Sequence, residues 1–303
     1  MTGSLPRWVE VDLARAVEIA GRHPDVHTDE LQAILYRDWY APATPIEPAT
    51  SWQPPLFGQY RAAHAGSTTF SAARVVALAP GGIVLAARDG ERPRALLAGD
   101  YCHSSVSERS GLAPRVGEQL LVVRRQDAPP AEGWWRTWGG GWRPSQPPEA
   151  LTRLYLAVEH ERVLELIGGL TATLQELATP WLLKAAAERV ALGRPDAVVV
   201  YLPSSDLGDA PESAPLIRTI ASCASRLVRD VRPALTYSIG RGVALAEDPA
   251  DGQSFGERQS SLAAGALIAA RDTGEDPHQV LIAALRAAGL DPVRPHRRPR
   301  SQP

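Results

Sequence analysis

The sequence is poor in lysine and cysteine, and it contains no long hydrophobic run. Lys184 is the single lysine among 32 basic residues, and all the others are arginines. The two cysteines, Cys102 and Cys223, form no C-x-x-C pair and have no histidine pair nearby, so neither a zinc site nor a disulfide framework is indicated. No apolar run approaches the roughly 18 residues of a membrane-spanning helix, and the N-terminus lacks a signal-peptide pattern. We therefore expect a cytoplasmic protein with no membrane contact.

A surplus of positive charge is also missing. The chain has 34 acidic and 32 basic residues, a net charge of −2, which argues against nucleic acid as its principal ligand because binding to phosphate backbones normally requires a basic surplus. Clustered Asp or His metal ligands are lacking as well, and we expect neither a metal nor a cofactor. The hydrophobic content of 44% is ordinary for a folded protein, and 303 residues suffice for one large or two modest domains.

The first half of the chain predicts helices followed by a small sheet. Apolar periodicity favours helices over 8–21 and 28–40, the second with Thr28 as N-cap. The proline-rich stretch 41–55 has too little periodicity for a regular element and indicates a loop. Short β-branched segments between 68 and 125, separated by glycine-containing turns, predict a small antiparallel β unit.

A segment rich in tryptophan and glycine separates the two halves. Residues 133–149 hold four tryptophans and four glycines, which could form an aromatic platform for a peptide; we favour a structural cluster covering the seam between two domains. Strand and helix patterns then follow one another in a mixed order. We predict an α+β protein with an N-terminal region at 1–145, a second α+β domain at 146–290 and a disordered tail at 291–303.

Four segments of the second half carry distinctive motifs in a recognisable order: RLYLAVE at 153–159, TPWLLKAAAERVALGRPDAVVVYL at 179–202, RPALTYSIGRGVALAEDP at 232–249 and QSFGERQSSLAAGAL at 253–267. Together they resemble the HopA-type type III effector domain family, which also forms the lyase component of class V lanthipeptide synthetases. The resemblance covers about residues 150–275. One departure is the run Leu235, Thr236 and Tyr237, where family members often have Phe-Thr-Lys, so the second cation of the family is either absent here or replaced by Arg241.

The resemblance implies a phosphoserine or phosphothreonine lyase that works with a kinase-like synthetase subunit, as a heterocomplex. The kinase would phosphorylate Ser or Thr of a precursor peptide, and the lyase would eliminate phosphate to leave dehydroalanine or dehydrobutyrine in lanthipeptide biosynthesis. The alternative is a non-catalytic HopA-like binding module that scaffolds the kinase-like partner and the precursor peptide. An unrelated phosphatase has little support, because the chain lacks clustered Asp or His metal ligands.

Elimination of phosphate needs a base for the Cα proton, and Lys184 is our candidate. It lies among uncharged residues in WLLKAAA, where loss of water would lower its pKa, whereas arginine stays protonated at any useful pH. The alternative is a surface lysine whose stem covers apolar groups.

Arginines suit the leaving phosphate, because the guanidinium group binds oxyanions in a bidentate fork. The candidates inside or beside the matching segments are Arg153, Arg189, Arg194, Arg241 and Arg258. Ser254 precedes a predicted helix, where it could hold phosphate or act only as an N-cap. Candidate general acids are Tyr155, Tyr201 and His160, and Glu247 could orient Lys184 or an arginine by ion pairing.

Overall fold

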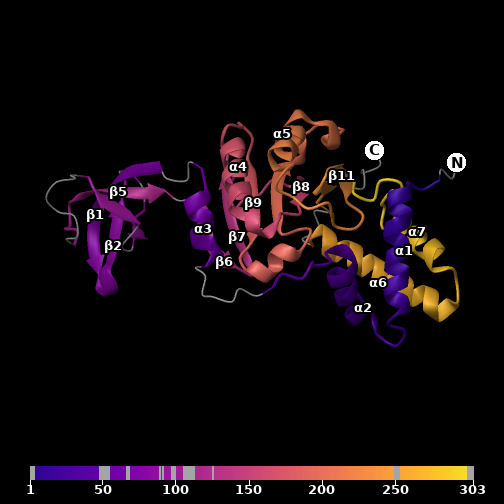
Figure 1. Ribbon diagram of the computed structural model, residues 1–303. Coiled ribbons are helices and arrows are strands. Elements are labelled where there is room, and N and C mark those ends of the chain that lie inside the picture. The colour runs from indigo at the N-terminus through magenta and orange to yellow at the C-terminus, as the bar shows by residue number, and fades with distance from the viewer. Residues whose placement is uncertain are drawn as a thin grey trace. The chain divides into compact units, whose positions relative to one another are not determined.

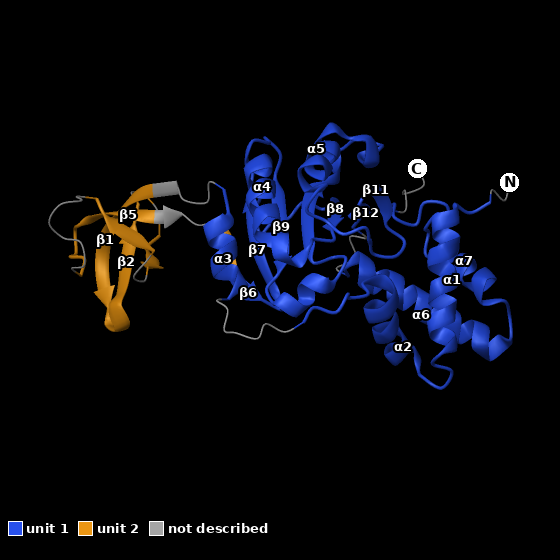
Figure 2. Cartoon of the chain, viewed as in Figure 1, with its two compact units in different colours: residues 1–65, 129–303 blue, residues 66–128 orange. Residues whose placement is uncertain are grey.

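The computed structural model (Figure 1) describes residues 4–47, 55–65, 69–88, 90, 92–96, 100–104, 113–124, 126–248 and 253–298. The chain forms two compact units, one of residues 1–65 and 129–303 and the other of residues 66–128 (Figure 2). This division differs from the predicted boundary at residue 145, because strands before that residue pair into the sheet of the larger unit. No helix of the described residues is long and apolar enough to cross a membrane.

The smaller unit is a five-stranded antiparallel sheet in the order β3-β2-β1-β5-β4. This is the small β unit that the β-branched segments predicted. Its core is small and consists of alternate residues of the strands, such as Ala73, Val75 and Leu120. The strands are β1 (Thr69–Ala79), β2 (Ile83–Ala87), β3 (Arg94–Leu96), β4 (Tyr101–His103) and β5 (Gln119–Arg124).

The larger unit is built on a seven-stranded sheet in the order β11-β12-β8-β10-β9-β7-β6. Neighbours from β11 to β7 pair in antiparallel fashion. The tryptophan-rich segment supplies β7 and is therefore part of the sheet. The strands are β6 (Asp127–Ala131), β7 (Trp134–Gly139), β8 (Leu151–Leu156), β9 (Trp181–Ala186), β10 (Val198–Pro203), β11 (Tyr237–Gly240) and β12 (Val243–Glu247).

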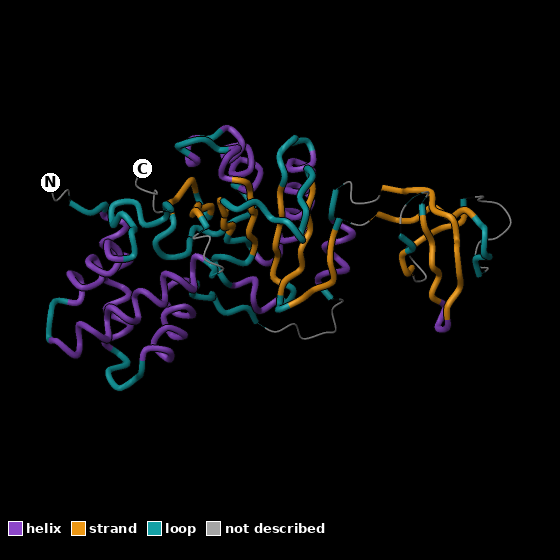
Figure 3. The backbone as a smooth tube through the Cα atoms, turned by 180° about the vertical axis from the view of Figure 1, so that it is seen from behind, coloured by secondary structure: helices purple, strands orange, loops and turns teal. Residues whose placement is uncertain are grey.

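Helices cover both faces of this sheet, as seen from behind in Figure 3. One face packs against α3 (Leu56–Ala63), α4 (Val163–Gln175) and α5 (Pro215–Ala224). The core on the other face includes α1 (Arg7–Gly21), α2 (Thr28–Leu35), α6 (Phe255–Thr273) and α7 (Pro277–Ala287), with α1 and α7 packed on the other helices. The helix predicted over 28–40 ends in a π-helical turn at Tyr36–Tyr40, and Thr28 is its first residue, with His27 as the N-cap. The α+β class is confirmed.

Strand alternation decides which side chains reach each face. Leu154 and Leu156 of β8 point into the core under α4, whereas Tyr155 between them faces the helices α2 and α6. On β10, Val200 likewise faces α4 and Val199 faces the opposite side. The polar residues of the central strands therefore gather on one face.

The C-terminal segment is ordered further than predicted. The ring of His296 is buried beside Trp8 and Tyr237, with ring centroids 6.0 and 5.0 Å away. The backbone N–H of Glu247 donates to the carbonyl of His296 (2.8 Å), and the Arg297 guanidinium pairs with Glu247 (2.6 Å). The disorder predicted from residue 291 is therefore wrong for 291–298, since aromatic contacts and backbone bonds can order a segment that has no apolar periodicity. Residues 299–303 lie outside the described part.

Candidate active site

A cavity of about 580 Å³ lies between the α6 face of the seven-stranded sheet and the π-helical turn. Strands β8, β9 and β10 form its floor, and the N-terminal turn of α6 contributes to its wall. Four tyrosines and several charged groups line it, so it can bind a polar ligand with an apolar portion. The lining residues are Tyr36, Tyr40, Glu132, Trp134, Arg153, Tyr155, Lys184, Asp196, Val199, Tyr201, Gln253, Ser254, Gly256 and Glu257.

The pairing register brings the predicted residues of the sheet together. Val199 on β10 pairs with Lys184 on β9 and with Tyr155 on β8. The next row of the same face pairs Tyr201 with Arg153. Cross-strand neighbours on one face are in direct contact range. Four candidates from three neighbouring strands thus form one site.

Lys184 is half-buried, and its Nζ lies 4.6 Å from the centroid of the Trp134 ring. Burial, followed by the positive charges of Arg136 and Arg153, lowers the pKa of Lys184 to about 8, although Asp196 acts in the opposite direction. A substantial fraction of the amine is therefore neutral near physiological pH. A neutral amine can accept a proton.

Arg153 is held rigidly at the edge of the cavity. Its Nε and Nη2 donate to Asp248 Oδ2 at 2.9 and 2.6 Å, and its guanidinium carbon lies 5.1 Å from the centroid of the Tyr201 ring. Burial alone would lower the pKa of Arg153, but Tyr155, Tyr201 and Asp248 raise it overall. The group stays charged, and its Nη1 makes no hydrogen bond to the described residues.

Tyr155 carries a buried hydroxyl at the floor of the cavity. The residue is 3% exposed, and its Oη makes no hydrogen bond of normal geometry to the described residues, although the Tyr40 hydroxyl lies near enough to act on the pKa of Tyr155. Burial raises the pKa of Tyr155, as it does the pKa values of Tyr40 and Tyr201. These hydroxyls are therefore protonated at neutral pH and can donate hydrogen bonds. A buried, unpaired hydroxyl is costly in a fold, which favours a role toward a ligand.

Ser254 lines the cavity, but its hydroxyl is occupied. It accepts from the backbone N–H of Glu257 (3.2 Å), while the Glu257 carboxylate accepts from the backbone N–H of Ser254 (2.7 Å). This reciprocal capping box begins α6. Gly256 packs so closely on the ring of Tyr40 that a Cβ would lie 2.2 Å from a ring carbon. The helix start and the π-helical turn are thereby held together.

Arg194 lies behind the wall of the cavity and is already paired. It donates to both carboxylate oxygens of Asp196 at 2.8 Å and to the Tyr36 hydroxyl at 3.0 Å. Asp196 is 5% exposed and lines the cavity. The structure therefore places Arg194 as the partner of a buried carboxylate, with its fork directed at that group.

Five other candidates lie away from the cavity: Glu247, Arg189, Arg241, Arg258 and His160. Glu247 pairs with Arg297 of the C-terminal segment instead of Lys184. Arg258 donates to the carbonyl of Ala288, and Arg241 is exposed in the turn between β11 and β12. Arg189 acts on the pKa of Tyr60, which belongs to the core on the opposite face, and His160 is an exposed partner of Glu161. These residues lie inside or beside the matching segments, but their side chains do not line the cavity.

Several lining residues were missed from the sequence. Tyr36 and Tyr40 come from the N-terminal half, and Glu132 and Trp134 come from the turn and strand before the matching segments. The one available signal was Asp196, an acidic residue two positions before the buried strand β10. Among the described residues, no group of three or more His, Cys, Asp or Glu side chains could hold a metal ion.

Comparison with known proteins identifies the family. The model of the HopA1 effector protein family matches residues 113–297. The chain belongs to this family. The HopA1 match confirms the resemblance drawn from the segments between 153 and 267, and it extends beyond them at both ends. No curated protein matches the sequence.

Two solved structures are similar in fold to this HopA1 family member. The effector protein from Pseudomonas syringae pv. tomato strain DC3000 matches with a TM-score of 0.58 and 14% identity, over 95% of this chain and 96% of that one. The effector protein from Pseudomonas syringae pv. syringae strain 61 matches with a TM-score of 0.55 and 14% identity, over 96% and 97% of the two chains. At this identity the likeness establishes the fold alone.

Proposed function

We propose that the cavity eliminates phosphate from phosphothreonine or phosphoserine in a peptide. The observation that carries the proposal is the placement of Lys184, the single lysine of the chain, in one cavity with Arg153 and the unpaired hydroxyl of Tyr155. These groups match the three needs of the reaction: a base, a cation for the departing phosphate and a hydrogen-bond donor for developing negative charge.

In the proposed reaction, the neutral amine of Lys184 takes the proton from the Cα atom of the phosphorylated residue. The electron pair of the broken C–H bond forms the Cα–Cβ double bond, and the Cβ–O bond breaks. Phosphate leaves with the electron pair of that bond. The products are a dehydroalanine or dehydrobutyrine residue and inorganic phosphate, and Lys184 then releases its proton to water.

Arg153 is the proposed phosphate ligand, because it lines the cavity, Asp248 fixes its orientation, and its Nη1 makes no hydrogen bond to the described residues. Tyr155 is the proposed donor to the substrate carbonyl, where negative charge develops as the Cα proton leaves. The phosphate is held by the charged guanidinium of Arg153, and once Lys184 has taken the Cα proton its ammonium group adds a second positive charge beside the leaving phosphate.

Three carboxylates also line the cavity, and each has a partner. Asp196 pairs with Arg194, Glu132 pairs with Arg136 at 2.9 Å, and Glu257 accepts the backbone N–H of Ser254. These contacts reduce their repulsion of a phosphate. Arg153 is thus the permanent cation at the floor of the cavity, and Lys184 becomes a second one after it has taken the proton.

The proposed biological setting is lanthipeptide dehydration, in which a kinase-like partner phosphorylates a precursor peptide and forms a complex with this chain. The test is to mix the purified protein with a synthetic phosphothreonine peptide, with and without a kinase partner, and to record product masses. Elimination removes the whole phosphoric acid, whereas hydrolysis restores the hydroxyl. A hydrolysed product would contradict the proposal.

The alternative is a binding module that scaffolds the kinase-like partner and the peptide without performing chemistry. It predicts that dehydration by the assembled system is the same with wild-type protein and with Lys184→Ala. Peptide binding without any change in product mass would favour this alternative.

A further inference from the structure

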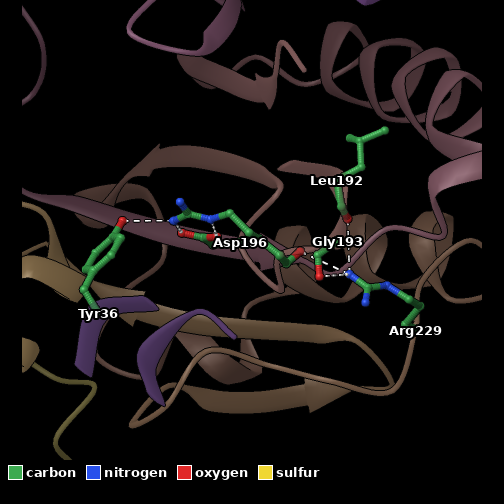
Figure 4. Close-up of polar contacts among 6 residues, drawn as sticks. Tyr36, Leu192, Gly193, Asp196 and Arg229 are labelled. Atoms are coloured by element: carbon green, nitrogen blue, oxygen red, sulfur yellow. Dashed lines mark hydrogen bonds and ion pairs between the residues drawn. The ribbon is translucent and has the colours of Figure 1, made fainter. Parts of the chain in front are cut away.

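Arg229 lies outside the cavity and gathers several backbone carbonyls around one guanidinium group (Figure 4). Its Nη2 donates to the carbonyl oxygens of Leu192, Gly193 and Arg194 at 3.2, 2.9 and 3.2 Å. Its Nη1 donates to the hydroxyl of Thr44 at 2.7 Å. The three carbonyls belong to the end of the 3-10 segment Arg189–Gly193 and to the residue after it. Arg229 therefore caps this segment where its last carbonyls have no helical partner.

The arm before α3 is fastened to the same point. The backbone N–H of Thr44 donates to the carbonyl of Gly193 at 2.9 Å. A Cβ built on Gly193 would lie 2.0 Å from the carbonyl oxygen of Thr44, so only glycine permits this approach. Arg229 thus ties together two stretches of chain that are far apart in sequence.

The backbone held by Arg229 is continuous with residues that line the cavity. Arg194, the last clamped residue, holds Asp196 and the hydroxyl of Tyr36 with its side chain. Both Asp196 and Tyr36 line the cavity. A shift of the clamped backbone would therefore move a buried carboxylate and an aromatic ring of the site together.

We infer that Arg229 is a positioning residue for this site, and that its clamp on residues 192–194 holds Asp196 and Tyr36 in the cavity wall. A lysine at this position could not replace it fully, because an ammonium lacks the planar fork that reaches several carbonyls from one side. The link to a reaction rests on the proposed function, whereas the placement of Asp196 and Tyr36 can be measured without it.

The position of Asp196 affects the pKa of Lys184, and that pKa can be measured. The other charged groups acting on that amine are Arg136 and Arg153, which lower its pKa, and Glu132, which raises it together with Asp196. Glu257 also faces the amine, since Lys184 contributes to lowering the pKa of that carboxyl. If the contacts of Arg229 are lost and Asp196 moves away, the attraction between its carboxylate and the ammonium form of Lys184 becomes weaker. The pKa of Lys184 then falls.

Because Lys184 is the single lysine, it can be observed directly. Reductive methylation with isotope-labelled formaldehyde marks only Lys184 and the α-amino group, and the NMR signal of Lys184 can be titrated with pH. We expect Arg229→Gln and Asp196→Asn each to shift the titration of Lys184 to lower pH. In the double variant the shift should equal that of Asp196→Asn alone, because the two residues act through one carboxylate. Arg229→Lys should lie between wild type and Arg229→Gln.

The matched control is Arg162→Gln. Arg162 also donates to a backbone carbonyl, that of Arg226 (2.9 Å), but it is exposed and does not line the cavity. It should leave the titration of Lys184 unchanged. In the elimination assay, Arg229→Gln should lower kcat by up to about 100-fold, the loss typical of displaced site groups.

An unchanged titration in Arg229→Gln, or shifts that add fully in the double variant, would overturn the inference. Should Arg229→Gln fail to fold, the titration of Arg229→Lys decides the question, and a wild-type curve there also overturns it. Failure of the proposed function gives a different pattern: no elimination by the wild type, with the expected titration shifts still present.

Discussion

Lys184 and Tyr155 flank Val199 in the seven-stranded sheet, because Val199 pairs with one on β9 and with the other on β8. Two strand spacings separate them, or roughly 9.5 Å between backbones. Both residues line the same cavity, one on each side of Val199. This arrangement suits a reaction in which a proton is removed while charge develops at a neighbouring carbonyl.

Replacing Lys184 by arginine should slow elimination strongly while a positive charge is kept at this position. Lys184→Arg keeps a cation that cannot act as a base, so the rate should fall by about 100- to 10,000-fold. Binding of a phosphothreonine peptide, measured by calorimetry, should change far less than the rate. Wild-type rates in Lys184→Arg would exclude Lys184 as the base.

The rate should rise with pH across the neutral range. The pKa of Lys184 is lowered to about 8, so the neutral, reactive amine increases about tenfold for each pH unit below that value and levels off above it. The measurement is kcat/KM for a phosphothreonine peptide between about pH 6 and 9.5. A rate that falls as pH rises through this range would indicate a protonated lysine as the active form.

Tyr155→Phe separates stability from activity. The Tyr155 hydroxyl is buried and makes no hydrogen bond of normal geometry to the described residues, with only the Tyr40 hydroxyl near it, so its removal should change the free energy of unfolding by no more than about 1 kcal/mol. Loss of a donor to the developing negative charge should nevertheless lower kcat by about 100-fold or more. Urea unfolding and the elimination assay give the two results. Equal activity in both proteins would remove Tyr155 from the mechanism.

Two glycines of α6 provide a matched pair of variants. Gly256→Ala places a Cβ against the ring of Tyr40 and should destabilise the protein by about 1–3 kcal/mol while displacing that ring from the cavity wall. Gly265 is exposed with open space around it, so Gly265→Ala should stabilise the helix by about 0.5–1 kcal/mol and leave activity unchanged. Thermal unfolding of both variants tests the close approach of α6 and the π-helical turn.

The sequence alone determined the α+β class, the HopA1 family and the special position of Lys184 among the basic residues. These features are local, so a reader of the sequence can find them.

Tertiary structure decided which charges face the cavity. The Arg194 guanidinium pairs with Asp196, and Glu247 pairs with Arg297. Tyr36, which lies far away in the sequence, also lines the cavity. Ion pairs between distant segments depend on strand order and helix packing, which no local pattern encodes. The sequence around an arginine therefore does not show whether its side chain binds a ligand or pairs with another residue of the protein. The tertiary structure decides this, because it determines which groups surround the guanidinium.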